Sequence, residues 1–173
     1  MKLLERINNI IFNLKFFTVP VNFIAKNKLF ELQFDNNWVY SKKGNSFYSF
    51  HNIEEDLKGG LQFTINWNVT TPDSMSEEDA VINLIEAEKG ATVKLEKIQL
   101  SKYSAILYFM KYDDSNMDIY KWIVYEEKVL IIINFMIFEE EPESKKLEWL
   151  KRVKAILETM VLDHTKFQST RMK

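Results

Sequence analysis

The residues that most often act as catalytic bases, nucleophiles and metal ligands are scarce in this sequence. It has no cysteine and only two histidines, His51 and His164. The absence of cysteine excludes disulfides, thiolate nucleophiles and cysteine-ligated zinc or iron–sulfur centres. Nothing in the spacing brings the two histidines together, and neither stands beside a nucleophile and an orienting group. The sequence therefore predicts no catalytic residue, no metal site and no cofactor.

Carboxylates are the other groups that could do chemistry, and their densest run lies at residues 139–143. Acidic residues ahead of a helix interact favourably with its N-terminal partial charge, which is the structural interpretation of this run. The functional interpretation is a docking patch for a basic protein, because local charge of opposite sign speeds association. Lysines on the same predicted helix partly neutralise the run. The candidate partner-binding residues are Asp113, Asp114, Asp118, Glu139, Glu140, Glu141 and Glu143.

Three residues between positions 113 and 118 match the start of a calcium-binding loop. Asp114, Asn116 and Asp118 occupy its first, third and fifth positions. The same loop needs a glycine at its sixth position and a bidentate glutamate at its twelfth. Ile119 and Tyr125 stand there instead. The segment is therefore predicted to be a polar hairpin tip between two strands.

Charge and hydropathy narrow the range of partners. The 173 residues, about the length of one domain, carry 23 basic and 25 acidic side chains and a net charge of −2. A chain whose net charge is close to zero lacks the overall positive potential that attracts the phosphate backbone of nucleic acids. No stretch reaches the ~20 apolar residues of a membrane-spanning helix, and polar residues between Asn8 and Lys15 interrupt the apolar N-terminus before it could form a signal peptide. We therefore expect a cytoplasmic protein that binds no nucleic acid.

Residues 1–28 are predicted to be an appendage to the domain. Apolar residues from Leu3 to Phe17 recur at helical spacing with polar residues opposite, and Pro20 stops the helix. This amphipathic helix would pack on its own domain or on a second copy of the chain, bind another protein, or lie on a membrane surface through residues 1–17. The domain itself is expected to span residues 29–163, followed by a polar tail over 164–173.

The segment 29–163 alternates between strand and helix patterns. Ser74 with Glu77 three residues later forms a capping box and predicts a helix that ends near Gly90. A second helix is predicted from Ser144 to Met160. Period-two patterns or continuous apolar runs predict strands at residues 29–34, 47–50, 61–67, 93–100, 104–112, 119–125 and 129–138.

The fold class follows from the connections and from the last strand. Most of the strands are joined by short turns, which favour antiparallel neighbours. The run Val129–Phe138 is apolar on both faces and must be covered on both. We therefore predict an α+β fold, in which a mostly antiparallel sheet of six to seven strands lies between helices on both faces, as an α/β/α sandwich. Four tryptophans are expected to fill the core: Trp38, Trp67, Trp122 and Trp149.

The order of elements is similar to that of a known family. It runs from Phe30-Glu31-Leu32-Gln33-Phe34 and Trp38 through a strand from Leu61, Thr71-Pro72-Asp73 before the capped helix, three hairpin-joined strands and a final helix. This order resembles the fold shared by the photosystem II extrinsic protein PsbP, the Ran-binding protein Mog and the bacterial DcrB-like lipoproteins. The resemblance covers about three-quarters of the chain. It implies an α/β/α sandwich that is used mainly to bind proteins or to serve as an assembly factor.

Two departures limit what the resemblance implies. The chain lacks the export signal and acylated cysteine of the lipoprotein members, and an N-terminal helix is not a usual family element. No functional residue is therefore carried over from the family to this chain.

Since no reactive group of residues emerges, the sequence favours a non-catalytic protein-binding module. An immunity protein that neutralises a toxin, an adaptor and an assembly factor all fit this description. One alternative is a small-ligand-binding protein or enzyme with a pocket between the sheet and a helix. Another is a peripheral membrane protein anchored by residues 1–17, and the N-terminal helix is also compatible with a homo-oligomer.

Overall fold

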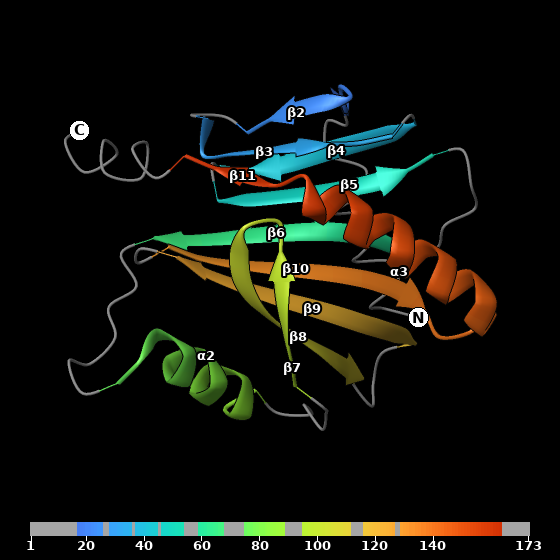
Figure 1. Cartoon of the computed structure of the whole chain (residues 1–173). Helices are drawn as coiled ribbons and strands as arrows, with labels where there is room; N and C mark the ends of the chain where they lie inside the picture. The colour runs from blue at the N-terminus through green and yellow to red at the C-terminus, as the bar shows by residue number, and fades with distance from the viewer. Residues whose placement is uncertain are drawn as a thin grey trace.

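The computed structural model describes residues 17–25, 28–35, 37–44, 46–53, 59–67, 75–88, 95–111, 116–126 and 129–163 (Figure 1). The predicted N-terminal helix, apart from Phe17, and the tail that includes His164 lie outside these ranges. The described elements, in chain order, are β1 Phe17–Thr18, β2 Asn22–Ile24, β3 Phe30–Gln33, β4 Trp38–Lys43, β5 Phe47–Asn52, β6 Gly59–Trp67, α2 Glu77–Glu86, β7 Glu96–Leu100, β8 Tyr103–Lys111, β9 Met117–Glu126, β10 Val129–Phe138, α3 Glu143–Glu158 and β11 Val161–Leu162.

The strands form two antiparallel sheets. The larger sheet has the order β1-β4-β5-β6-β10-β9-β8-β7, and the smaller one has the order β11-β3-β2. Consecutive strands from β7 to β10 are hairpin neighbours, as their short connections predict. The predicted α+β class with a mostly antiparallel sheet is confirmed, with eight strands in the larger sheet of the described chain where six to seven were expected.

Strand β10 places apolar side chains on both faces of the larger sheet. Its odd-numbered residues from Val129 to Ile137 belong to the larger core cluster, while Leu130, Ile132 and Met136 contact a second, smaller cluster. Successive side chains of a strand point to opposite faces. The two clusters therefore lie on opposite faces of the sheet.

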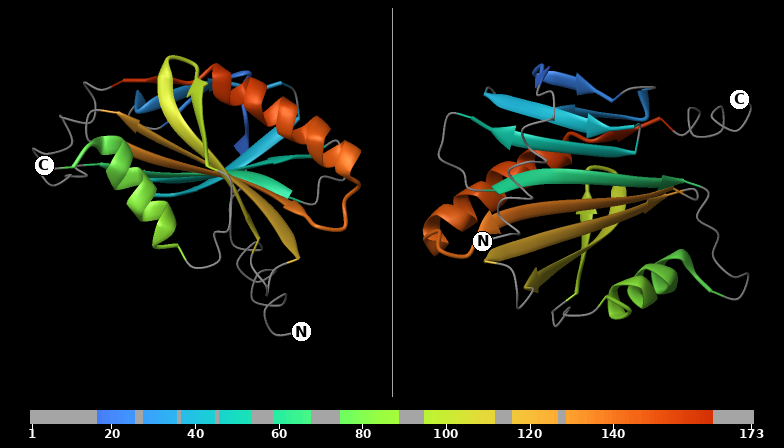
Figure 2. Two further views of the ribbon diagram at one scale, coloured as in Figure 1. Left: turned by 60° about the horizontal axis from the view of Figure 1, so that its bottom comes forward. Right: turned by 180° about the vertical axis from the view of Figure 1, so that it is seen from behind.

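The larger cluster is rich in aromatic side chains and is covered by α3 and the small sheet. Phe23, Phe30, Phe50 and Phe63 contact one another with ring centroids 5.0–6.0 Å apart. Seen from behind, strands β6, β10 and β9 lie in front of α3, which places α3 on the face that Figure 1 presents (Figure 2, right). Trp38, Trp122 and Trp149 are buried here as expected, whereas the side chain of Trp67 lies outside the described part of the structure.

The smaller cluster lies beneath α2. Val81 and Ile85 of this helix are buried against residues of β8, β9 and β10, including Ile106 and Ile123. On the same face, β6 presents Gln62 and Thr64, which are half-buried. Among the described residues, helical cover of this face is therefore limited to the strands β8–β10.

Several predicted boundaries differ from the structure. Residues 17–25, assigned to the appendage, instead pair with the domain as β1 and β2, because Val19, Phe23 and Ala25 supply apolar surface to the larger core. Helix α2 begins after Ser76 rather than after Ser74: Ser76 is extended and its Oγ accepts a hydrogen bond from the Asp79 amide at 3.1 Å. The helix ends at Glu86, with Ala87 as its C-cap, before the predicted stop at Gly90.

Candidate functional site

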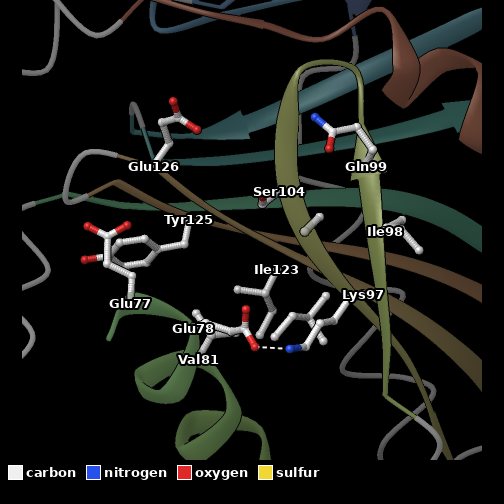
Figure 3. Close-up of a pocket in the computed structure, with 12 residues that line it drawn as sticks. Glu77, Glu78, Val81, Lys97, Ile98, Gln99, Ser104, Ile123, Tyr125 and Glu126 are labelled. Atoms are coloured by element: carbon white, nitrogen blue, oxygen red, sulfur yellow. Dashed lines mark ion pairs between the residues drawn. The ribbon is translucent and has the colours of Figure 1, made fainter. Parts of the chain in front are cut away.

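An open cleft of about 700 Å³ lies between α2 and the strands β7, β8 and β9. Its floor is apolar and includes Val81, Ile106 and Ile123. Its rim is polar, with Glu77 and Glu78 from α2, Lys97 and Gln99 from β7, Ser104 from β8, and Tyr125 and Glu126 from β9 (Figure 3). An apolar floor with a few polar groups around it is the usual composition of a binding site.

The β7–β8 hairpin builds one wall of this cleft. Its two-residue connection contains Ser101 at a φ of 56°, a left-handed conformation that suits the first central position of a tight hairpin turn. The register pairs Lys97 with Ile106 and Gln99 with Ser104. Directly opposed residues of an antiparallel pair share one face of the sheet. The hairpin therefore presents its polar rim and part of the apolar floor to the same space.

The charges of the rim are unevenly distributed. Lys97 forms an ion pair with Glu78, and both side chains are at least half exposed. Glu77 and Glu126 form no ion pair with any described residue. Glu77 lies beside Tyr125 (Figure 3), whereas the register pairs Tyr125 with Leu130 and Glu126 with Val129, which places Glu126 on the opposite face of the sheet. Burial raises the pKa of the Tyr125 hydroxyl above its ordinary value, and the charge of Glu77 raises it further. At this end of the cleft, one carboxylate thus lies beside a phenol.

A buried polar cluster anchors the helix that forms the other wall. The Tyr108 hydroxyl donates to Glu88 at 2.6 Å, and the buried Lys121 ammonium donates to the other carboxylate oxygen of Glu88. Glu88 follows directly after the C-cap of α2, so this cluster ties the end of the helix to β8 and β9. The salt bridge between the buried Lys121 and Glu88 therefore anchors α2, which forms this wall of the cleft, to the sheet.

The geometry limits the chemistry of the cleft. No group of three or more histidine, aspartate or glutamate side chains in the described ranges is arranged to hold a metal ion.

Of the predicted acidic candidates, Asp118 and Glu143 are tied to the start of α3. The Lys146 ammonium donates to Asp118 at 2.6 Å and to Glu143 at 3.1 Å. The side chains of Lys146 and Asp118 are only 4% and 8% exposed. The hydrogen bond to Asp118, and next the bond to Glu143, raise the pKa of Lys146 despite its burial. The pair anchors α3 to β9.

The remaining acidic candidates divide into three groups. Glu139 forms an ion pair with Lys111, and Glu141 forms one with Lys145 at 3.1 Å. Glu140 is exposed, and Asp113 and Asp114 lie outside the described residues. Most of the described carboxylates in this set are therefore engaged by lysines of the same chain, and a docking role for the set stays a prediction.

His51 is held within the sheet. Its Nε2 lies 3.0 Å from the Ser49 hydroxyl and its Nδ1 lies 3.2 Å from the carbonyl oxygen of Gly59. Burial lowers the pKa of His51, while the backbone hydrogen bond to Gly59 acts in the opposite direction. The ring also fills the space where a side chain at Gly60 would project. These contacts give His51 a packing role.

The sequence pattern does not predict this cleft. Glu77 follows Ser74 at the spacing of a capping box, and Glu126 follows the strand predicted over 119–125, so both match only local patterns. The rim residues are brought together by the pairing of β7, β8 and β9 and by the seating of α2 on β9. A pattern within a short stretch of sequence cannot predict that these residues come together.

Comparisons with known proteins support the fold. No protein-family model matches the chain, and no curated protein matches its sequence. A crystal structure of a protein from Bacteroides thetaiotaomicron superposes with a TM-score of 0.55 at 11% identity, over 86% of this chain and 48% of that one. The solution structure of the cyanobacterial PsbP protein (CyanoP) from Synechocystis sp. PCC 6803 superposes with a TM-score of 0.51 at 14% identity, over 87% of this chain and 92% of that one. The fold is PsbP-like.

At these identities the similarity extends to the fold alone. The chain spans about half the length of the Bacteroides protein. Similar folds carry unrelated functions, so function has to be argued from the cleft. Within the described residues, no helix is both long and apolar enough to cross a bilayer.

Proposed function

We propose that the chain is a non-catalytic, cytoplasmic protein-binding module and that a partner protein docks at the cleft between α2 and the β7–β8 hairpin. An immunity protein, an adaptor and an assembly factor are the kinds of protein that fit this function. The resemblance to PsbP-like proteins is compatible with it.

The observation that carries the proposal is the composition of the cleft. Interfaces have an apolar centre surrounded by a polar rim that shields it from water. Val81, Ile106 and Ile123 supply such a centre, and the charged and amide side chains around them supply the rim. The cleft is open to solvent, so a protruding segment of another protein can enter it.

Filling the cleft provides the test. Ser104 is exposed on its wall, so Ser104→Trp places a large side chain in the cleft without burying a polar group. Ser144→Trp makes the same change at an exposed position on α3 and is the matched control. Tagged wild type and both variants would be used to capture proteins from lysate of the native host, with identification by mass spectrometry.

The expected result is a partner that the wild type and Ser144→Trp retain and that Ser104→Trp loses. If Ser104→Trp retains the same partner as the wild type, or if none of the three proteins retains one, the proposal is wrong. Circular dichroism of the variants checks that each is folded.

The second candidate is a small-ligand-binding protein that uses the same cleft. The observation in its favour is the volume of about 700 Å³, which lies within the range of small-molecule sites. Its position between the sheet and a helix also matches the alternative that the sequence left open. A metabolite extract that raises the melting temperature of the wild type, but not that of Ser104→Trp, would favour this function over protein binding.

A further inference from the structure

We propose that residues 3–16 form an amphipathic helix that packs, within the same chain, on the face of β4, β5 and β6 that α2 leaves uncovered. The contact goes beyond the proposed function, because the sheet order places β4–β6 and the cleft strands β7–β9 on opposite sides of β10. Residues 3–16 lie outside the described ranges, whereas the strands that would receive them are described.

The burial of two serines is the first observation. Ser41 and Ser49 lie opposite each other in β4 and β5, and their exposed fractions are only 1% and 6%. Tyr48 and Phe50, the neighbours of Ser49, belong to the larger core cluster, so the serines point to the opposite face. Seen from behind, no described helix lies in front of β4 and β5 (Figure 2, right), and α2 packs on β8–β10. Since serine side chains are short and usually accessible, their burial indicates a cover that the described residues do not supply.

The composition of this face is the second observation. Val39 and Phe47 are half-buried on the same face, on either side of the two serines. Short side chains between larger apolar ones leave room for the branched side chains of a helix. Packing of such a helix would also remove the two apolar margins from water.

The segment 3–16 supplies the complementary surface. Its aliphatic residues recur at helical spacing and form one stripe. They are Leu3, Leu4, Ile7, Ile10, Ile11 and Leu14. A helix of this length is marginal in water by itself and is stabilised by packing of its apolar stripe. The face of β4–β6 provides that packing.

The point at which the chain enters the sheet decides whether the segment can reach this face. Phe17 pairs with Tyr40, and β1 is the neighbour of β4 in the larger sheet. A helix over residues 3–16 would be about 21 Å long, whereas β1 and β6 are three strand spacings apart, or about 14 Å. The helix is therefore long enough to cross β4 and β5. A segment tethered at the edge of a face meets it at a high effective concentration, which favours the same chain over a second copy or a membrane.

Thiol labelling tests the proposal, because the chain has no cysteine of its own. Ser49→Cys in the full chain places a single thiol on the face that the helix would cover. Its rate of reaction with a water-soluble disulfide reagent would be measured alone and in combination with Ile7→Asp/Ile11→Asp, which places two charges in the aliphatic stripe. We expect the thiol to react at least about tenfold faster beside the two aspartates, because an unpaired carboxylate is costly to bury.

Asn9→Asp/Asn13→Asp is the matched control, since it adds the same charge on the polar side of the helix. With this pair, the labelling rate should stay within about twofold of that of Ser49→Cys alone. Equal rates in the two aspartate variants overturn the proposal. It is also overturned if Ser49→Cys alone reacts as fast as Ser104→Cys, a reporter at an exposed position. Circular dichroism checks that each variant is folded.

Disulfide formation gives a second test that introduces no charge. Ser49→Cys would be combined in turn with a cysteine at each position of the aliphatic stripe, and with Asn9→Cys or Asn13→Cys as controls. We expect an intramolecular disulfide with at least one stripe position and with neither control. Disulfides formed only between two chains would assign the segment to a second copy. Flotation of the wild type with anionic vesicles, together with rapid labelling of Ser49→Cys, would assign it to a membrane, and either result overturns the proposal.

Discussion

Two acidic regions of this molecule differ in whether their carboxylates form ion pairs with lysines of the same chain. Around the start of α3, Asp118, Glu139, Glu141 and Glu143 are each paired with a lysine of the same chain. At the cleft rim, Glu77 and Glu126 lack such a lysine within the described residues. The acidic run near α3 is denser in the sequence, and three lysines, Lys111, Lys145 and Lys146, pair with four of its carboxylates.

The difference shows that charge density along a sequence does not reveal which carboxylates are paired with lysines in the folded chain. Ion pairs such as Lys146 with Asp118 contribute to the anchoring of a helix, whereas uncompensated rim charges contribute to association with something else. The predictions below test this contrast.

The largest effect is expected at the buried pair near α3. Lys146→Met leaves Asp118 buried without its cation, and we expect a loss of about 3–5 kcal/mol in the free energy of unfolding. Urea denaturation measures it. Lys111→Met, which removes an exposed lysine paired with the exposed Glu139, should cost less than about 1 kcal/mol. Similar losses in the two variants would mean that burial does not distinguish these pairs.

The polar cluster at the end of α2, formed by Glu88, Tyr108 and Lys121, should show an intermediate effect. Glu88→Gln removes the anion that faces Lys121 and accepts from Tyr108, and we expect a loss of about 1–3 kcal/mol. Glu86→Gln, an exposed change on the same helix, should stay within about 0.5 kcal/mol of the wild type. An unaffected Glu88→Gln protein would show that the cluster does not hold α2 in place.

The pKa of Tyr125 reports on the negative end of the cleft. Glu77→Gln should lower this pKa, but the value should remain above that of a free tyrosine, because burial is the larger cause of the shift. Ultraviolet titration of the phenolate, with Tyr125→Phe to assign the signal, measures it. An unchanged pKa would mean that Glu77 does not act on the ring.

The same shift has a consequence for stability. The folded pKa of Tyr125 lies above that of the unfolded chain, so at pH values above about 10 the unfolded state holds fewer protons than the folded state. Stability should therefore fall as the pH rises through this range. Tyr125→Phe should lose less stability over the same interval, and an equal loss would contradict the assignment.

The smallest effect is expected at the exposed pair of the cleft rim. Lys97→Met should change the free energy of unfolding by less than about 0.5 kcal/mol, because both partners are largely solvated. A larger loss in urea denaturation would contradict the solvated state of this pair.

The sequence predicted the strands and the fold class well because those signals are periodic and local. The alternation in Leu61, Phe63 and Ile65 and the two apolar faces of β10 follow directly from burial in a covered sheet. Three of the strands it missed, β1, β2 and β11, are only two or three residues long, too short for a period-two pattern to register. The fourth, β4, has six residues, but Trp38 and Ser41 are its buried positions, so its apolar and polar residues do not alternate.

The same reasoning could not predict the cleft. Glu77 and Tyr125, which both line it, are 48 residues apart in the chain and are brought together by the packing of α2 on β9. The ion pairs of the acidic candidates could not be predicted either, because the pairing of Asp118 with Lys146 and of Lys111 with Glu139 depends on strands and a helix distant in sequence. A docking role for these carboxylates stays a prediction. Contacts between residues that are distant in the sequence, rather than local composition, determine which carboxylates form ion pairs.

Hydrogen–deuterium exchange on the full chain, with and without the partner captured from lysate, tests the central claim most directly. The account predicts that the partner slows amide exchange at residues 75–88 and 95–106 and leaves residues 139–158 unchanged. Slower exchange at residues 139–158, with none at the walls of the cleft, would contradict it and would assign partner binding to the acidic segment instead.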